Sequence, residues 1–153
     1  MSAPNLPLHR QARTGDESTV VALMRDFYTE EHLVFDEIVT PRAVHELLSQ
    51  PALGTVLLFT HAGSVIGYLA LTYGFSLEFH GRYALLDELY LIPAVRGRGW
   101  GRHALTVAAG TARDAGVAAL RLEVNHANLR ARSTYLKSGY QDNRRDLLTL
   151  WLR

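Results

Sequence analysis

The sequence predicts a mixed α/β fold, in which one sheet of antiparallel and parallel strands carries helices on both faces. Three observations predict this fold. Hairpin patterns in the first half imply antiparallel strands, and a strand–helix–strand pattern in the second half implies a parallel pair. Between the two halves, a glycine-rich segment, Arg96–Gly101, follows an apolar strand and opens a helix.

Turn and cap signals divide the chain into elements. Thr14 or Asp16 can cap a first helix, and Thr40 followed by Pro41 is typical of a second helix start. The strand at 65–75 is apolar on both faces, which is typical of a central strand covered on both sides. We expect strands at 8–12, 55–61, 65–75, 83–91, 118–124 and 146–152, and helices at about 16–31, 40–49, 99–115 and 128–138.

The composition excludes several classes of function. The 153 residues suit a single domain, 1–153, with a flexible start at 1–7. The 16 basic residues nearly balance the 15 acidic ones, so we expect no nucleic-acid partner. The chain has no cysteine and its 7 histidines show no ligand spacing, so we expect no metal. No apolar run is long enough for a membrane span, and no signal peptide is recognisable, which predicts a cytoplasmic protein without a membrane partner.

The segment from Leu85 to Gly101 predicts an anion site. Pro93 ends an apolar strand, and Gly97, Gly99 and Gly101 alternate with other residues where a helix begins. Backbone N–H groups at a helix start lack partners, the helix dipole favours negative charge there, and glycines allow a phosphate to approach closely. We therefore expect a cofactor that carries a pyrophosphate.

A dinucleotide-binding motif is one alternative interpretation of this loop. Gly99-x-Gly101-x-x-Ala104 fits G-x-G-x-x-G/A, and Glu123 follows at the expected distance. Such a motif usually opens a doubly wound domain, whereas here only a short tail follows Glu123. A nucleotide-binding P-loop is not favoured, because G-x-x-x-x-G-K-[S/T] does not occur.

A longer pattern explains the loop better. Arg96-Gly97-Arg98-Gly99-Trp100-Gly101 fits R/Q-x-x-G-x-G/A, and a second motif with Asn128, Tyr135 and Gly139-Tyr140 follows it. Together the two motifs resemble the GCN5-related N-acetyltransferase (GNAT) family, and the resemblance covers nearly the whole chain. It implies a mixed, mostly antiparallel sheet of six to seven strands flanked by four helices. Because few residues follow Gly139, one of the family's last two strands is expected to be short or absent.

The resemblance also implies how acetyl-CoA is bound. The loop would hold the pyrophosphate mainly through its backbone, and the strand before it would pair with the pantetheine arm. Asn128 would contact the pantetheine, cap its helix, or do both. Tyr135 would protonate the leaving thiolate, unless its ring only fills the core. The expected cofactor-binding residues are Leu89, Tyr90, Leu91, Arg96, Gly97, Arg98, Gly99, Trp100, Gly101, Arg102, Asn128 and Tyr135.

Two neighbouring acids, Asp87 and Glu88, interrupt the apolar strand before the loop. Carboxylates are rarely buried without a partner, so one of them is expected to serve chemistry. A strand period of two would place them on opposite faces, and that argument does not choose between them. In polyamine-type and aminoglycoside-type family members, an acid nine residues before the loop Arg contacts the amine. That position is Asp87 here, so we expect Asp87 to serve the amine ahead of Glu88.

We therefore expect an acetyl-CoA-dependent N-acetyltransferase that moves acetyl directly to a primary amine. Acids near the end of the first helix, including Glu30, Glu31 and Asp36, predict a small cationic acceptor such as a polyamine, an aminoglycoside or a basic amino-acid derivative. The alternatives are a protein N-terminal or lysine acetyltransferase, and a non-catalytic acyl-CoA-binding sensor on the same fold. The sequence is compatible with a homodimer.

Overall fold

The computed structural model describes residues 5–153, so residues 1–4 of the predicted flexible start lie outside the described residues. The chain forms two compact units, one ending at Glu123 and one running from Val124 to Arg153. All strands and the first three α-helices belong to the first unit, and the fourth α-helix belongs to the second.

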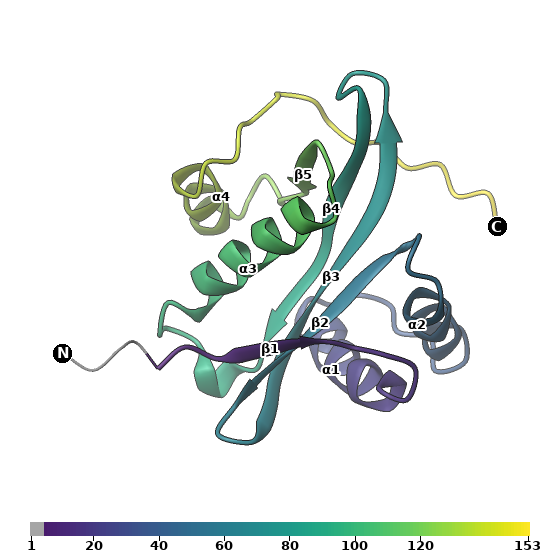
Figure 1. Ribbon diagram of the computed structural model, residues 1–153, viewed down its shortest axis with the longest axis vertical. Helices are drawn as coiled ribbons and strands as arrows, with labels where there is room; N and C mark the ends of the chain where they lie inside the picture. The colour runs from purple at the N-terminus through teal and green to yellow at the C-terminus, as the bar shows by residue number, and fades with distance from the viewer. Residues whose placement is uncertain (1–4) are drawn as a thin grey trace. The chain divides into compact units, whose positions relative to one another are not determined.

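Within the described part of the first unit, five strands form one sheet in the order β1-β2-β3-β4-β5 (Figure 1). The first three pairs are antiparallel, and only the β4–β5 pair, which a helix connects, is parallel. This confirms the mixed α/β fold, whereas the expected count of six to seven strands is wrong. The strands are β1 (Leu8–Gln11), β2 (Gly54–His61), β3 (Ser64–Ser76), β4 (Gly81–Leu91) and β5 (Ala119–Leu122).

Helices cover both faces of this sheet. The helices α1 (Glu17–Glu30) and α2 (Val39–Ser49) pack on one face, where Tyr68 and Ala70 of β3 belong to the buried core between helices and sheet. The next residues along β3, Leu69 and Leu71, point to the other face and are completely buried. The helix α3 (Trp100–Asp114) contacts β3, β4 and β5. The central position predicted for β3 is thus confirmed.

The start of α2 differs slightly from the predicted one. The helix begins at Val39 rather than after a Thr40 cap. The carboxylate of Asp36 accepts the backbone N–H groups of Ile38 and Val39, both at 2.8 Å, and so satisfies two donors of the helix start. Pro41 then lies in the first turn, where its missing N–H costs no helical hydrogen bond.

The second unit contains α4 (Leu129–Lys137) and the extended residues after it. The strand predicted at 146–152 is absent: residues 140–153 are all described and contain no helix or strand. A strand requires a partner for its backbone N–H and C=O groups, and residues 124–153 offer no other strand. The apolar side chains of this segment are 73–90% exposed: Leu147, Leu148, Leu150, Trp151 and Leu152.

Candidate functional site

The glycine loop leads from the end of β4 to the start of α3. A short 3-10 helix, Pro93–Val95, follows the strand. Gly97 and Gly99 then have φ values of 77° and 78°, in the left-handed region that favours glycine. Gly99 is the N-cap of α3 and provides no side chain to cap the helix. The first N–H groups of a 15-residue helix are therefore left for another acceptor.

The surroundings of the loop suit an anion. The first turn of α3 contains no acidic residue, and Arg98 and Arg102 are exposed beside it. A Cβ added at Gly97, Gly99 or Gly101 would meet no atom within 4 Å, so the protein itself does not fill this space. Backbone donors, helix dipole and cations of this kind are together suited to binding a phosphate group.

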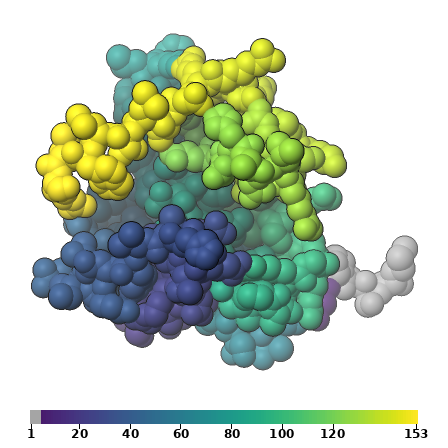
Figure 2. Space-filling view, turned by 180° about the vertical axis from the view of Figure 1, so that it is seen from behind, coloured from purple at the N-terminus to yellow at the C-terminus, as the bar shows by residue number. Residues whose placement is uncertain are grey.

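Two further residues of the predicted loop have structural contacts. The side chain of Trp100 is buried, with its ring centroid 4.7 Å from that of His61, so Trp100 can serve a ligand only through its backbone. The guanidinium of Arg96 donates from Nε to the Leu91 carbonyl at 2.9 Å and from Nη2 to Glu30 at 2.9 Å. Figure 2 shows the α1–α2 region beside the segment around residue 100, in agreement with this ion pair.

β4 contains a β-bulge, which changes the expected geometry of its two acids. Glu88 lies opposite Ala70 of β3, but the next pair is Leu86 with Leu71, so Asp87 has no counterpart. Opposed residues point to the same face. Glu88 therefore faces α1 with Ala70, and Leu86 faces α3 with Leu71.

The prediction that Asp87 and Glu88 face opposite sides is wrong, because it assumed an unbroken period of two. The charge of Asp87 raises the pKa of Glu88 and of the Tyr28 and Tyr68 hydroxyls, all of which lie on the α1 side. Asp87 also directly follows Leu86, which faces α3, so alternation along the strand directs the Asp87 side chain to the α1 side as well. The extra residue of the bulge brings both acids together on one face.

Asp87 lies where the pairing of β4 and β5 ends. The last pair is Leu86 with Leu122, and β4 continues alone on this side to Leu91. Within the described first unit, Leu89 and Leu91 thus pair with β3 only, which leaves the other edge of the strand open. The pKa of Asp87 is raised, first by the protein atoms that surround this partly exposed side chain and second by the charge of Glu123.

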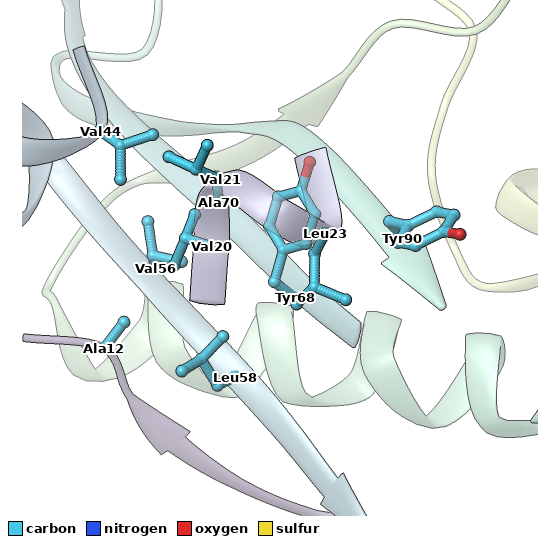
Figure 3. Close-up of a cluster of buried hydrophobic side chains, with 10 residues drawn as sticks. All are labelled: Ala12, Val20, Val21, Leu23, Val44, Val56, Leu58, Tyr68, Ala70 and Tyr90. Carbon is cyan, nitrogen blue, oxygen red and sulfur yellow. The ribbon is translucent and has the colours of Figure 1, made fainter. Parts of the chain in front are cut away.

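Glu88 is held by two tyrosine hydroxyls. Tyr28, from the last turns of α1, donates to Oε1, and Tyr68, from β3, donates to Oε2 at 2.7 Å. Figure 3 shows Tyr68 and Tyr90 among the buried side chains on the α1 side of the sheet. Burial raises the pKa of Glu88, the two hydrogen bonds act against this rise, and Asp87 adds to it. The net effect is a raised pKa, which suits a general base.

The acids near the end of α1 are mostly engaged. Glu30 is paired with Arg96, Glu37 is paired with Arg25, and Asp36 caps α2. These contacts compensate the charges of the acids locally. The negative potential near the end of α1 is therefore weaker than the number of acids in the sequence suggests. Glu31 is exposed at the C-cap of α1 and has no ion pair among residues 5–153.

Two predicted site residues belong to the second unit. Asn128 is the N-cap of α4, and its Oδ1 accepts the Ala131 N–H at 3.1 Å, a bond that does not use its side-chain amide N–H groups. Tyr135 lies two turns later and packs edge-on against Tyr140, with ring centroids 5.9 Å apart. Burial raises the pKa of Tyr135 beyond the usual range of a phenol, so its hydroxyl keeps its proton at neutral pH.

The sequence reasoning missed three residues of this arrangement: Tyr28, Tyr68 and Glu123. A tyrosine in an apolar stripe is indistinguishable from a core residue until its hydroxyl has a partner. Among the described residues, no group of three or more His, Asp or Glu side chains could hold a metal ion. None of the described helices is long and apolar enough to cross a membrane.

Known proteins resemble this chain over most of its length. An uncharacterized N-acetyltransferase, YhfO, from Bacillus subtilis is 28% identical over 88% of this chain and 89% of its own. The thialysine N-epsilon-acetyltransferase of Bos taurus is 28% identical, with 87% of this chain and 83% of that one covered. A predicted acetyltransferase from Clostridium acetobutylicum, solved with acetyl-CoA, shares the fold at a TM-score of 0.77 and 19% identity, covering 96% of this chain and 97% of that one.

The family itself is shown by a longer match. Residues 20–140, which include the whole glycine loop, Asp87, Glu88 and Tyr135, match the model of the acetyltransferase (GNAT) family. The alternative of a dinucleotide-binding domain is thereby set aside. The chain belongs to the GNAT family and is an N-acetyltransferase.

Proposed function

We propose that this N-acetyltransferase moves acetyl from acetyl-CoA to a small cationic primary amine. One observation carries the proposal: Asp87 and Glu123 are the residues that directly follow the last β4–β5 pair, Leu86 with Leu122, and neither has an ion pair among residues 5–153. Adjacent carboxylates without a cation repel each other, and an ammonium group bound beside them would remove that cost.

The relative from Bos taurus supports this acceptor class, because its name gives an ε-amine as the acetylated group. Acetyl-CoA supplies the thioester. The start of α3, with Gly97, Gly99 and Gly101, fits the pyrophosphate, since it offers free N–H groups and open space. The open edge of β4 at Leu89–Leu91 fits an extended chain that pairs through its main-chain groups.

The acids of β4 divide the work on the amine in this proposal. Asp87, which is partly exposed and beside Glu123, binds the ammonium form. Glu88, whose pKa is raised, takes a proton from it. The neutral nitrogen then forms the C–N bond to the acetyl carbon as the C–S bond breaks, and it releases its second proton to solvent. The Tyr135 hydroxyl gives a proton to the leaving sulfur and is restored from solvent.

A neutral peptide is a second candidate acceptor. The residues from the end of α1 to the first residue of α2 include Leu33, Val34, Ile38 and Val39, which are 51–91% exposed, and exposed apolar groups of this kind can hold a peptide side chain. With a neutral acceptor, Glu31 would not bind a cation. This candidate does not explain why Asp87 and Glu123 lie together without a counter-ion.

The test is a panel of acceptors at equal concentration, with acetyl-CoA saturating and thiol release as the readout. We expect polyamines, aminoglycosides and lysine analogues to be acetylated faster than peptides with uncharged side chains. Faster acetylation of the peptide N-termini would contradict the proposed acceptor. Thermal stabilisation by acetyl-CoA without turnover of any acceptor would indicate an acyl-CoA sensor instead.

A further inference from the structure

We propose that Tyr28 and Tyr68 are positioning residues, which hold the Glu88 carboxylate in the orientation that takes the proton from the acceptor amine. The inference rests on the proposed function, because it assigns supporting residues to the base of that reaction. Neither tyrosine belongs to the glycine loop or to the motif around Tyr135.

The hydrogen-bond geometry supports an oriented carboxylate. Each oxygen of Glu88 accepts one hydroxyl, from α1 on one side and from β3 on the other. A carboxylate oxygen can accept two hydrogen bonds, so one acceptor position remains on each oxygen. The two bonds fix the plane of the group, and the remaining positions are free for an ammonium N–H or a bridging water.

The two tyrosines are themselves held in place. Tyr68 is 1% exposed, and its ring lies 6.4 Å from that of Tyr90. Tyr28 packs edge-on against Phe35, with ring centroids 5.9 Å apart. The last turn of α1 is also fastened to the glycine loop by the Glu30–Arg96 pair. Neither hydroxyl can follow a displaced carboxylate easily, so the pair defines one position for Glu88.

The charge of Glu88 is costly for a purely structural role. Glu88 is half-buried, and among residues 5–153 it has no ion pair with Lys, Arg or His. A glutamine could accept a hydrogen bond from a tyrosine without the desolvation cost of an ion. A half-buried carboxylate that is stabilised only by hydroxyls, and that has a raised pKa, is typical of a group used in proton transfer.

The arrangement makes a signed prediction for pH dependence. The groups that face Glu88 are Tyr28 from α1, Tyr68 from β3 and Asp87 from β4 itself. Both hydroxyls lower the pKa of Glu88, whereas burial and Asp87 raise it. Removing either hydroxyl therefore raises this pKa further. Because the base must be deprotonated, the acidic limb of the kcat profile moves to higher pH.

The experiment measures kcat against pH, with acetyl-CoA and the best amine of the panel both saturating, for the full chain. Tyr28→Phe and Tyr68→Phe keep the rings and remove only the hydroxyls. We expect each to move the acidic limb up by about one pH unit, as for the loss of one hydrogen bond to a charged group. The KM for acetyl-CoA should stay within about twofold, since the glycine loop is unchanged.

Two controls keep the test specific. Tyr73→Phe removes a hydroxyl from a half-buried tyrosine of the same strand, for which no bond to Glu88 is seen, and should leave the limb in place. Glu88→Gln should lower kcat by at least about 10²-fold and abolish the limb, as expected for loss of the base. Tyr28 is less buried than Tyr68, so its variant serves if Tyr68→Phe does not fold.

The outcomes separate the two proposals. If the wild-type enzyme is active and Tyr28→Phe has the same acidic limb of the kcat profile, this inference is overturned and the proposed function stands. A limb that moves equally in Tyr73→Phe would also overturn it. A wild-type enzyme that acetylates no amine of the panel would overturn the proposed function, and this inference with it.

Discussion

Two regions along β4 offer a ligand different kinds of contact. At the end of the strand, the glycine loop offers backbone N–H groups, left-handed glycines and open space. In the middle, the bulge offers the side chains of Asp87 and Glu88, with tyrosines and Glu123 around them. A backbone site is specified by a short local motif, whereas a side-chain site depends on register and on contacts from distant elements. The first therefore suits a cofactor shared by a family, and the second suits an acceptor that differs among its members.

The largest expected effect is at the backbone end. Gly99→Val places a β-branched side chain at a φ of 78° and in the space that the phosphates would occupy. We expect acetyl-CoA binding to fall by at least about 10²-fold, measured by calorimetric titration. Gly116→Val is the matched control, because it imposes the same backbone strain, at a φ of 72°, just after the other end of α3. If both variants bind acetyl-CoA equally, the loop is not the pyrophosphate site.

Loss of the proposed general acid should come next in size. Tyr135→Phe keeps the ring that packs on Tyr140 and removes the hydroxyl. We expect kcat to fall by roughly 10²-fold, with the KM for acetyl-CoA nearly unchanged. Single-turnover rates measure this directly, and Tyr140→Phe provides a control on the same aromatic pair. A single-turnover rate equal to that of the wild type would assign Tyr135 to packing.

Substitutions of Asp87 and Glu88 should change the kinetics with respect to the amine. Asp87→Asn removes the proposed ammonium partner while keeping the size of the residue, so we expect the KM for the amine to rise by about tenfold. Glu88→Gln should instead act mainly on kcat. Initial rates over a range of amine concentrations distinguish the two. An unchanged KM in Asp87→Asn, together with a raised KM in Glu88→Gln, would exchange the two roles.

Salt should change the KM for the amine by a smaller factor. Exposed charges are screened within about 10 Å at 0.1 M ionic strength. We expect the KM for a multiply charged amine to rise several-fold between low and moderate salt in the wild type, and less in Asp87→Asn. The comparison uses a fixed, saturating acetyl-CoA concentration. Equal salt dependence in both proteins would remove Asp87 from the recognition of charge.

The smallest expected effect concerns Glu30, which the sequence suggested as an acceptor-binding residue. Its carboxylate is already paired with Arg96, and the pair is exposed, so it contributes little to stability. Glu30→Gln should lower the melting temperature only slightly and leave the KM for the amine within about twofold. Glu31→Gln is the neighbouring comparison. A KM for the amine that rises in Glu30→Gln would restore its predicted role.

The sequence predicts the glycine loop better than it predicts the arrangement of Asp87 and Glu88. Gly97, Gly99 and the start of α3 lie within a few consecutive residues, so local motif and structure coincide. The position of Asp87 depends on a bulge that only the pairing of β4 with β3 reveals. Likewise, the contact of Tyr28 with Glu88 joins residues 60 positions apart. The predicted strand at 146–152 has strand-like residues but no backbone partner in its own unit, because apolar pattern alone does not supply one.

A double-variant cycle tests most directly whether the glycine loop and the acids Asp87 and Glu88 act independently, each on its own substrate. Arg98→Ala should weaken acetyl-CoA binding mildly, since Arg98 is an exposed cation of the loop, and Asp87→Asn should weaken binding of the amine. The measurement is the initial rate of both single variants and the double variant with acetyl-CoA and amine varied together. We expect the double variant to combine a raised KM for acetyl-CoA with a raised KM for the amine, each equal to that of its single variant within about twofold. A single variant that raises the KM for the other substrate would contradict the account. A double variant whose KM values differ from those of the single variants by about tenfold would also contradict it.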